Sequence, residues 1–337
     1  MQRVTLGKTG LCVNKNGFGA LPIQRVEMEG AVRILQKAYD SGVDYFDTAR
    51  AYSDSEEKIG RALSHVRDKI VISTKTQAQD AAGFWADLET SLRTLKTDYI
   101  DIYQFHNPAF CPVPGGADGL YDAACRAKEQ GKIRHIGITN HRLAVAREAI
   151  ESGLYETLQF PLSYLSADGD IALADACRSA DMGFIAMKAL AGGLITNSAC
   201  AYAWMAQPQF SHVAPIWGIQ RETELDEFLL YQDAPPALDE AMLRLIEADR
   251  AQLAGDFCRG CGYCMPCPAG IEINNCARMS LMLRRAPQAG WLSEEWQAKM
   301  KKIEDCLHCN QCRKKCPYGL DTPALLAKNY EDYKTFL

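Results

Sequence analysis

Short apolar runs alternate with amphipathic stretches over the first 230 residues, and this rhythm limits the available folds more than any other feature. An opening hairpin signal, TLGKTGLCV, precedes eight candidate strands, each followed by a helical pattern such as Met28–Tyr39 or Glu56–Leu63. The strands are predicted at Gly17–Ala20, Val43–Asp47, Ile70–Thr74, Tyr99–Phe105, Ile133–Thr139, Thr157–Phe160, Gly183–Met187 and Val213–Ile216. The alternation indicates a parallel α/β fold, and its regular spacing and total length favour a closed (β/α)8 (TIM) barrel.

An open doubly wound sheet is the alternative to the barrel. Such a sheet is expected to carry a glycine-rich phosphate turn after its first strand, but GFGALPIQ at that position lacks the third glycine.

Polar side chains end four consecutive candidate strands. Asp47 ends the second strand, and Lys75, His106 and Asn140 end the third, fourth and fifth. In a (β/α)8 barrel the chemistry takes place at the carboxyl ends of the strands. One lysine or histidine in such a place is usually a surface or structural group, but four in succession predict a shared polar site.

Eight of the 14 cysteines form two compact runs near the C-terminus, each ending in Cys-Pro. The runs are Cys258, Cys261, Cys264 and Cys267, and Cys306, Cys309, Cys312 and Cys316. Three thiolates spaced two residues apart can surround one face of a cubic iron–sulfur cluster, which a distant cysteine then closes. Zinc is the main alternative, although zinc ribbons use cysteines in pairs. Disulfides fit less well, because the opening MQRVTLGKTG has no apolar signal region.

The two runs resemble the module of the two-cluster bacterial ferredoxins. In that family the cysteine before the proline ligates the other cluster. The resemblance therefore implies two [4Fe–4S] clusters, one on Cys258, Cys261, Cys264 and Cys316 and the other on Cys306, Cys309, Cys312 and Cys267. The first run has two residues, rather than the commoner three, before its last cysteine, and this departure is compatible with the crossed arrangement.

The length of 337 residues suits one large and one small domain. A Pro-Pro break at positions 235 and 236 precedes an amphipathic pattern. We expect a barrel over residues 1–234, a connecting helix over 235–254, and a small, mostly α ferredoxin-like iron–sulfur domain over 255–337. A unit of about 80 residues buries little apolar surface alone, so its clusters would also stabilise its fold.

Charge and hydropathy restrict the partners. The net charge of −5 is spread over both signs without a long block, which argues against a nucleic-acid partner. No apolar run reaches the roughly 18 residues that a membrane span requires. The expectation is a soluble, cytoplasmic protein of an oxygen-poor cell, with no membrane partner.

The barrel segment resembles the aldo-keto reductases over about residues 3–230. The stretch YFDTARAYSDSEEKIGRAL carries the resemblance, together with ISTKT, IDIYQFHNP, KIRHIGITNH and LQFPLSY. The family's catalytic tetrad then falls on Asp47, Tyr52, Lys75 and His106. Tyr52 would protonate the carbonyl oxygen on which charge develops. Its ordinary pKa near 10 would be lowered by the Lys75 ammonium, which Asp47 would hold, and His106 would orient the substrate oxygen.

The same resemblance implies a nicotinamide site, although several family residues are replaced in it. The implied contacts are Thr139, Asn140 and Gln159 at the carboxamide, Met187 at the ring, Lys188, Leu190 and Gly192 along the pyrophosphate, and Gly218, Gln220 and Arg221 at the adenosine phosphate. Met187 stands where many members stack a tyrosine, and a thioether packs less rigidly. Arg221 could pair with a 2′-phosphate, whereas Glu224 would repel one, so both NADP and NAD stay open.

The leading functional hypothesis is an oxidoreductase that interconverts a small carbonyl and an alcohol with nicotinamide. Its clusters would relay electrons to or from a separate carrier. Hydride carries two electrons and each cluster normally passes one, so we weigh two alternatives. One is single-electron reduction by the clusters without nicotinamide, and the other is a non-catalytic electron-transfer or redox-sensing protein on a retired barrel.

Overall fold

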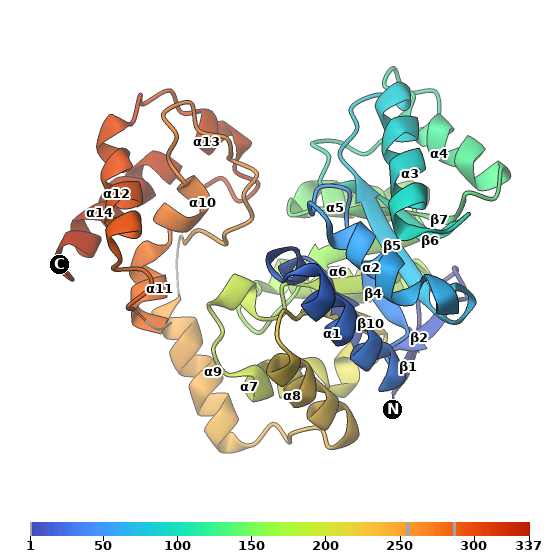
Figure 1. Cartoon of the computed structure of the whole chain (residues 1–337), viewed down its shortest axis with the longest axis horizontal. Helices are drawn as coiled ribbons and strands as arrows, with labels where there is room; N and C mark the ends of the chain where they lie inside the picture. Colours follow the sequence, from blue (N-terminus) through green and yellow to red (C-terminus); the bar gives the residue numbers. More distant parts are fainter. Residues whose placement is uncertain (1, 254–256, 286–287) are drawn as a thin grey trace. The chain divides into compact units, whose positions relative to one another are not determined.

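The computed structural model describes residues 2–253, 257–285 and 288–337 (Figure 1). An antiparallel hairpin of β1 (Arg3–Thr5) and β2 (Cys12–Asn14) opens the chain, and eight parallel strands then close into a barrel. The barrel strands are β3 (Gly17–Gly19), β4 (Tyr45–Asp47), β5 (Val71–Thr76), β6 (Ile100–His106), β7 (Ile133–Thr139), β8 (Thr157–Pro161), β9 (Gly183–Met187) and β10 (Val213–Gly218). They follow chain order around the barrel, and β10 pairs with β3 to close it. The predicted hairpin and (β/α)8 barrel are confirmed.

A helix follows each barrel strand. The helices are α1 (Met28–Asp40), α2 (Ser55–Leu63), α3 (Ala81–Leu95), α4 (Leu120–Glu129), α5 (Leu143–Ser152), α6 (Asp168–Ser179), α7 (Ser198–Met205) and α8 (Glu222–Asp233). In α1, Ile34, Leu35 and Ala38 recur at helical spacing and are buried. The Glu27 carboxylate caps the same helix by accepting from the Gly30 backbone N–H. The two helices predicted by name differ from the observed ones by one residue at one end.

Four strands run further than their sequences indicate, β6 and β8 by one residue each and β5 and β10 by two. The third strand was expected to end at Thr74, but β5 continues to Thr76, because Lys75 and Thr76 pair with β6. The eighth was expected to end at Ile216, but β10 continues to Gly218, because its last residues pair with β3. Lys75 therefore lies inside a strand rather than after one.

The opening hairpin contributes to the apolar core of the barrel. Val4, Leu6 and Val13 form a buried cluster with side chains from several barrel strands, among them Tyr45 and Ile185. Each fully buried aliphatic side chain contributes about 1.5–3 kcal/mol. The hairpin is therefore part of what stabilises the barrel.

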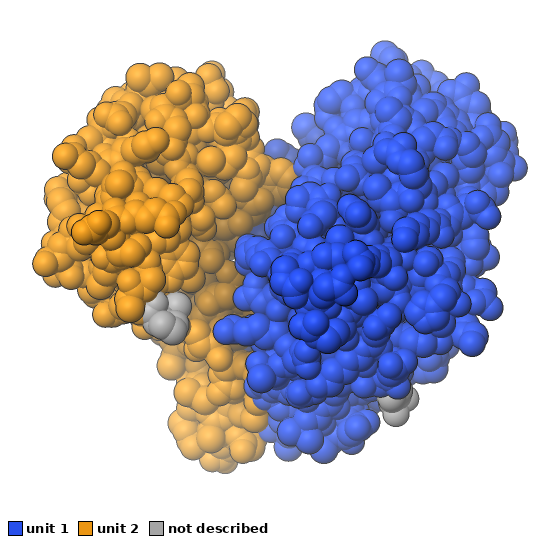
Figure 2. Space-filling view, viewed as in Figure 1, with its two compact units in different colours: residues 1–189, 202–238 blue, residues 190–201, 239–337 orange. Residues whose placement is uncertain are grey.

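The chain divides into two compact units, which Figure 2 distinguishes by colour. The first comprises residues 1–189 and 202–238, and the second comprises residues 190–201 and 239–337. The second unit contains α9 (Glu240–Gln252), α10 (Ile273–Cys276), α11 (Met279–Arg285), α12 (Glu294–Lys301), α13 (Gln311–Lys315) and α14 (Thr322–Lys334). Its described residues contain no strand, in line with the prediction of a mostly α unit.

A connecting helix was expected over residues 235–254, and within that range α9 covers only Glu240–Gln252. The boundary expected between residues 254 and 255 lies outside the described residues. After the first cysteine run, α10 and α11 are separate helices, with positions 277 and 278 between them. None of the helices in the described parts of the chain is long and apolar enough to cross a membrane.

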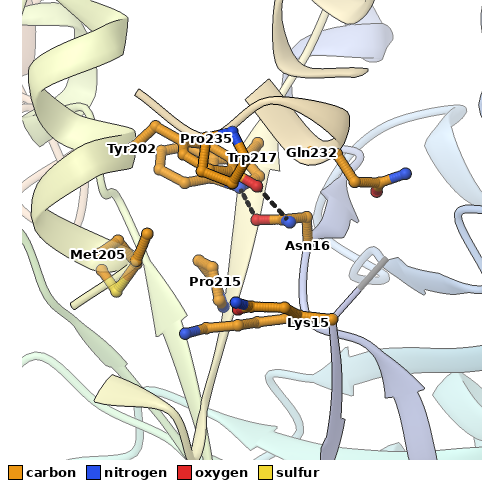
Figure 3. Close-up of a pocket in the computed structure, with 10 residues that line it drawn as sticks. Lys15, Asn16, Tyr202, Met205, Pro215, Trp217, Gln232 and Pro235 are labelled. Carbon is orange, nitrogen blue, oxygen red and sulfur yellow. Dashed lines mark hydrogen bonds between the residues drawn. The ribbon is translucent and has the colours of Figure 1, made fainter. Parts of the chain in front are cut away.

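A small pocket lies beside the amino end of β3 (Figure 3). The polar residues predicted for chemistry lie instead at or near the carboxyl ends of the barrel strands. Asn16 spans the pocket by donating to the Tyr202 hydroxyl over 2.8 Å and accepting from the Trp217 indole over 3.0 Å. Lys15 extends past Pro215 and is only 5% exposed. Burial lowers the pKa of Lys15, and no carboxylate among the described residues forms an ion pair with it.

We expect Lys15→Met to stabilise the protein near pH 7 by on the order of 1 kcal/mol, because it removes a buried amine without an ionic partner. The pKa of Lys15 is lower in the folded than in the unfolded chain. Between the two pKa values the unfolded chain therefore binds more protons, so the free energy of unfolding rises with pH. The destabilisation that Lys15 causes thus decreases as pH rises. The gain should therefore be smaller near pH 10, as measured by urea unfolding at both pH values. Lys37→Met, at a partly exposed lysine paired with Asp226, is the control and should bring no gain. A loss of stability at both pH values would contradict the assignment.

Candidate functional site

A buried ion pair joins two neighbouring barrel strands at their carboxyl ends. The Lys75 ammonium donates to the Asp47 carboxylate over 2.6 Å and to the Thr48 carbonyl over 2.6 Å. Lys75 and Asp47 are 1% and 2% exposed. Burial lowers the pKa of Lys75, and the charge of Asp47 opposes that shift.

Tyr52 and His106 complete this group. The Lys75 nitrogen lies 5.4 Å from the centre of the Tyr52 ring. The His106 ring meets the Tyr52 ring edge-on, with centroids 5.8 Å apart and planes at 83°. The structure thus brings together the four residues that the sequence places in a tetrad, from β4, β5, β6 and the loop before α2.

The loop that carries Tyr52 is fixed from both sides. The Arg50 backbone N–H donates to the Lys75 carbonyl over 3.0 Å. The Arg50 guanidinium pairs with the Glu56 carboxylate, which is 1% exposed and also accepts from the Thr74 hydroxyl over 2.6 Å. A buried, hydrogen-bonded carboxylate resists displacement, so it restricts the path of the chain on either side of Tyr52.

Left-handed backbone conformations directly follow three of the predicted site residues. Ser53, after Tyr52, has φ of 39°, Asn107, after His106, has φ of 55°, and Lys188, after Met187, has φ of 57°. Residues other than glycine adopt this conformation where the surrounding structure imposes it, and such residues cluster at functional sites. The backbone conformation directly after Tyr52, His106 and Met187 is therefore imposed by the residues packed around it.

His106 is an uncharged group in this setting. Burial lowers its pKa to about 3, and the nearby Lys75 charge acts in the same direction. At neutral pH a neutral imidazole can offer one N–H donor and one acceptor but no charge. His106 can therefore position an oxygen without adding a second cation to the site.

Two members of the site were not predicted from the sequence. The Ser73 hydroxyl donates to Asp47 over 2.6 Å, and the Gln104 amide donates to Gln159 over 2.8 Å and to Asp47 over 3.4 Å. Strand alternation could have indicated both residues, because side chains two positions apart in a strand share a face. Ser73 precedes Lys75 by two residues, and Gln104 precedes His106 by two.

The predicted carboxamide contacts already have protein partners. The Gln159 amide donates to Asp47 over 3.3 Å. The Asn140 amide donates to the Pro108 carbonyl over 2.8 Å, and its oxygen accepts from the Arg142 N–H over 2.8 Å at the start of α5. Thr139 and Met187 are buried, with the Thr139 hydroxyl 3.9 Å from the Met187 sulfur. A carboxamide at this position would therefore have to share or replace existing hydrogen bonds.

The remaining predicted cofactor residues fall in both units. Lys188, Gly218, Gln220 and Arg221 belong to the first unit, while Leu190 and Gly192 belong to the second. Glu224 pairs with the Arg221 guanidinium over 2.7 Å and accepts from the Gln220 N–H over 2.9 Å. The Glu224 carboxylate thus already neutralises the Arg221 guanidinium.

The eight clustered cysteines line two cavities in the second unit. Cys258, Cys261, Cys264 and Cys316 line a cavity of about 340 Å³, and Cys267, Cys306, Cys309 and Cys312 line one of about 390 Å³, to which Cys264 also contributes. Both runs therefore contribute to each cavity: Cys316 joins the first, and Cys264 and Cys267 join the second. A crossed arrangement of this kind is what the ferredoxin resemblance implies. No three His, Cys, Asp or Glu side chains of the described residues converge on a single-metal position.

The donor set fits an iron–sulfur cluster in each cavity. Four thiols around one space are the ligands that a [4Fe–4S] cluster requires. Burial raises the pKa of Cys264 to about 12 and also raises that of Cys258, so these groups are protonated thiols when nothing is bound. Cluster binding would release those protons, which couples it to pH and to folding.

Comparison with known proteins accounts for both units. The aldo/keto reductase family model matches residues 15–229, and a model described as a 4Fe-4S dicluster domain matches residues 257–321. The chain belongs to the aldo/keto reductase family. Both the family and the added dicluster domain were predicted from the sequence and are confirmed.

Relatives in this family match over part of their length. L-galactose dehydrogenase of Arabidopsis thaliana is 30% identical over 211 residues, covering 57% of this chain and 66% of the relative. Methylglyoxal reductase DkgA of Yersinia pestis is 34% identical over 146 residues, covering 42% and 50%. Aldo-keto reductase YhdN of Bacillus subtilis is 32% identical over 163 residues, covering 42% and 47%. The chain thus spans about half to two thirds of these relatives.

Solved aldo-keto reductases share the fold. The holo form of one from Bacillus halodurans is 21% identical, covers 74% of this chain and 96% of its own, and has a TM-score of 0.63. A second, described as a putative aldo-keto reductase from Pseudomonas aeruginosa, is 23% identical, covers 67% and 92%, and has a TM-score of 0.58. At these identities the likeness establishes the barrel architecture of this family member.

The crossed cysteine sets can be tested with paired substitutions. Cys258→Ser/Cys316→Ser would damage one crossed site, whereas Cys258→Ser/Cys267→Ser would damage both. After anaerobic reconstitution, we expect the first variant to keep about four of the roughly eight irons per chain and the second to keep fewer. Cys276→Ser, at a buried cysteine outside both runs, is the control and should retain all of them. The reverse order, with more iron in Cys258→Ser/Cys267→Ser, would show that each run holds its own cluster.

Proposed function

We propose that this chain is an oxidoreductase that interconverts a small carbonyl compound and the corresponding alcohol with a nicotinamide cofactor. The observation that carries the proposal is the buried Lys75–Asp47 pair beside the Tyr52 ring, with His106 edge-on to the same ring. A hydroxyl, a cation and a neutral imidazole together suit the protonation of an oxygen that gains negative charge.

The protein's own groups would then act as follows. When bound, the nicotinamide supplies or accepts the hydride. In the reducing direction the Tyr52 hydroxyl donates its proton to the carbonyl oxygen, and the Lys75 ammonium stabilises the tyrosinate that remains. Asp47 holds that ammonium, neutral His106 donates a hydrogen bond to the substrate oxygen, and Tyr52 regains a proton from solvent.

The structure favours a dinucleotide without a 2′-phosphate. Arg221 is the basic residue that could pair with such a phosphate, yet Glu224 already pairs with it. Glu224 also accepts from the backbone N–H groups of Gln220 and Arg221, which an anion would otherwise use. A 2′-phosphate would have to displace this carboxylate, so we propose NAD in preference to NADP.

The cysteine-lined cavities suit single-electron chemistry. Two [4Fe–4S] clusters, held by the crossed sets, would each supply one-electron exchange, and together they match the two electrons of one hydride. We propose a separate electron carrier as the partner of this unit. Lys75 and Tyr52 would perform the same proton transfer whether or not that exchange takes place.

One observation favours a second candidate function, single-electron reduction without nicotinamide. The Gln159 and Asn140 amides already have protein partners, and Met187 replaces an aromatic ring. Anaerobic calorimetry with NADH separates the two functions. Stoichiometric binding would exclude the second, and no binding at millimolar NADH would exclude the first.

Removal of the Tyr52 hydroxyl tests the proton transfer. Tyr52→Phe should lower kcat by about 10²- to 10⁴-fold on an aldehyde and ketone panel with NADH, because it deletes the general acid. Lys75→Met should act in the same direction. Tyr39→Phe, on α1, is the matched control and should leave kcat unchanged. Full turnover of every active carbonyl by Tyr52→Phe would mean that another group donates the proton.

A charge substitution tests the cofactor preference. Glu224→Gln keeps the shape of the side chain and frees the Arg221 charge, so KM for NADPH should fall relative to that for NADH, by roughly 3- to 10-fold for a partly exposed pair. Glu222→Gln is the control, because Glu222 is an exposed carboxylate of the same helix α8 and lies near Lys37 of α1. It should change the ratio of the two KM values little. Equal shifts in both variants would indicate a general charge effect instead.

A further inference from the structure

Arg278 lies between two loops of the second unit. It occupies the break between α10 and α11 and is 8% exposed. Its guanidinium donates to the Gly192 carbonyl over 2.8 Å and lies 3.3 Å from the Met282 sulfur. Gly192 belongs to residues 190–201, which follow β9 in the chain and belong to the second unit.

Two glycines allow this close approach. A Cβ on Gly260 would lie 2.4 Å from an Arg278 guanidinium nitrogen, and a Cβ on Gly192 would lie 3.2 Å from the same nitrogen. Both glycines have left-handed φ, of 62° and 66°, so other residues would also be strained there. Gly260 sits between Cys258 and Cys261, so the cation contacts the first cysteine loop as well as residues 190–201.

The charge of Arg278 acts on the cysteine side. The Gly260 backbone N–H donates to the Cys258 sulfur over 3.4 Å, and the Arg278 guanidinium packs against Gly260, so the cation lies next to this cavity. A cation this close favours any added negative charge at that cavity. Arg285 donates to the Leu194 carbonyl over 2.6 Å and pairs with Asp249, so residues 190–201 have a second anchor two positions after Gly192.

We propose that Arg278 is a positioning residue that couples the first cysteine cavity to residues 190–201. Reduction of the cluster in that cavity and binding of the dinucleotide pyrophosphate would then influence each other through one cation. The inference rests on the proposed function, in which Leu190 and Gly192 lie along the pyrophosphate. The new element is an interaction through Arg278 between the cluster cavity and the dinucleotide site.

The sign of the coupling follows from charge. An electron added to the cluster and a pyrophosphate beside Gly192 are both negative, and both attract the Arg278 guanidinium. When one of them engages the cation, less of the attraction of Arg278 is available to the other. Reduced protein should therefore bind the dinucleotide more weakly, and bound dinucleotide should lower the reduction potential of that cluster. Linkage requires the two effects to be equal.

The experiment uses the reconstituted full chain without oxygen and ADP-ribose as a redox-inert probe that carries the pyrophosphate. Potentials are measured by titration monitored by electron paramagnetic resonance, with and without saturating ADP-ribose. Its Kd is measured by calorimetry on oxidised and dithionite-reduced protein. We expect about tenfold weaker binding to the reduced protein, which corresponds to a fall of about 59 mV in the potential of one cluster. The potential of the other cluster should change less.

Three variants identify the residue responsible. Arg278→Gln removes the charge but keeps a donor for Gly192, and it should abolish the shift while ADP-ribose still binds the oxidised protein. Arg278→Lys keeps the charge and should retain the shift. Arg284→Gln, at a partly exposed arginine of α11 that pairs with Asp332, is the control and should also retain the shift.

The wild-type measurements decide the question even if a variant loses iron. Equal ADP-ribose affinity in both redox states, with unchanged potentials, would overturn the coupling and leave the proposed function standing. A shift that persists in Arg278→Gln would overturn the role of Arg278. A complete lack of ADP-ribose binding, together with no NADH binding, would overturn the proposed function itself.

Discussion

The buried pair of Lys75 and Asp47 is the interaction on which the rest of the site depends. Both groups are almost inaccessible to water, so a charge on either one would carry a large desolvation cost without the opposite charge of the other. Loss of one partner from such a pair typically destabilises a protein by about 3–5 kcal/mol. The pair also fixes the position of a cation beside Tyr52. The barrel thus holds the two charges together, and their geometry sets what Tyr52 can do.

A second buried carboxylate, that of Glu56, restrains the chain around Tyr52 without belonging to the tetrad. Glu56 binds Arg50 and the Thr74 hydroxyl, and so restrains the loop that carries Tyr52. The site therefore consists of strand residues with fixed positions and one loop residue whose loop is pinned. Preorganisation of this kind is what electrostatic catalysis requires, because no reorganisation is then needed during the reaction.

The order of the strands, their approximate positions and the grouping of Asp47, Tyr52, Lys75 and His106 could be predicted, because each leaves a local pattern in the sequence. Gln104 was missed although it alternates with His106, since a glutamine inside a strand has no distinctive chemistry. Arg278 left no local signal, because its partner Gly192 is 86 positions away. The partners of Asn140 could not be predicted either, since an amide that suits a ligand also suits the start of a helix. Local pattern thus defines the fold, while long-range contacts decide what each polar group is free to do.

The exchange of one cysteine between the two runs has a consequence for biogenesis. Cys267 and Cys316 each line the cavity formed mainly by the other run, so a cluster bound in either cavity would draw its ligands from both runs. Neither cluster could then be completed before the second run had been synthesised, and a proteolytic cut between the runs would separate the ligands of both.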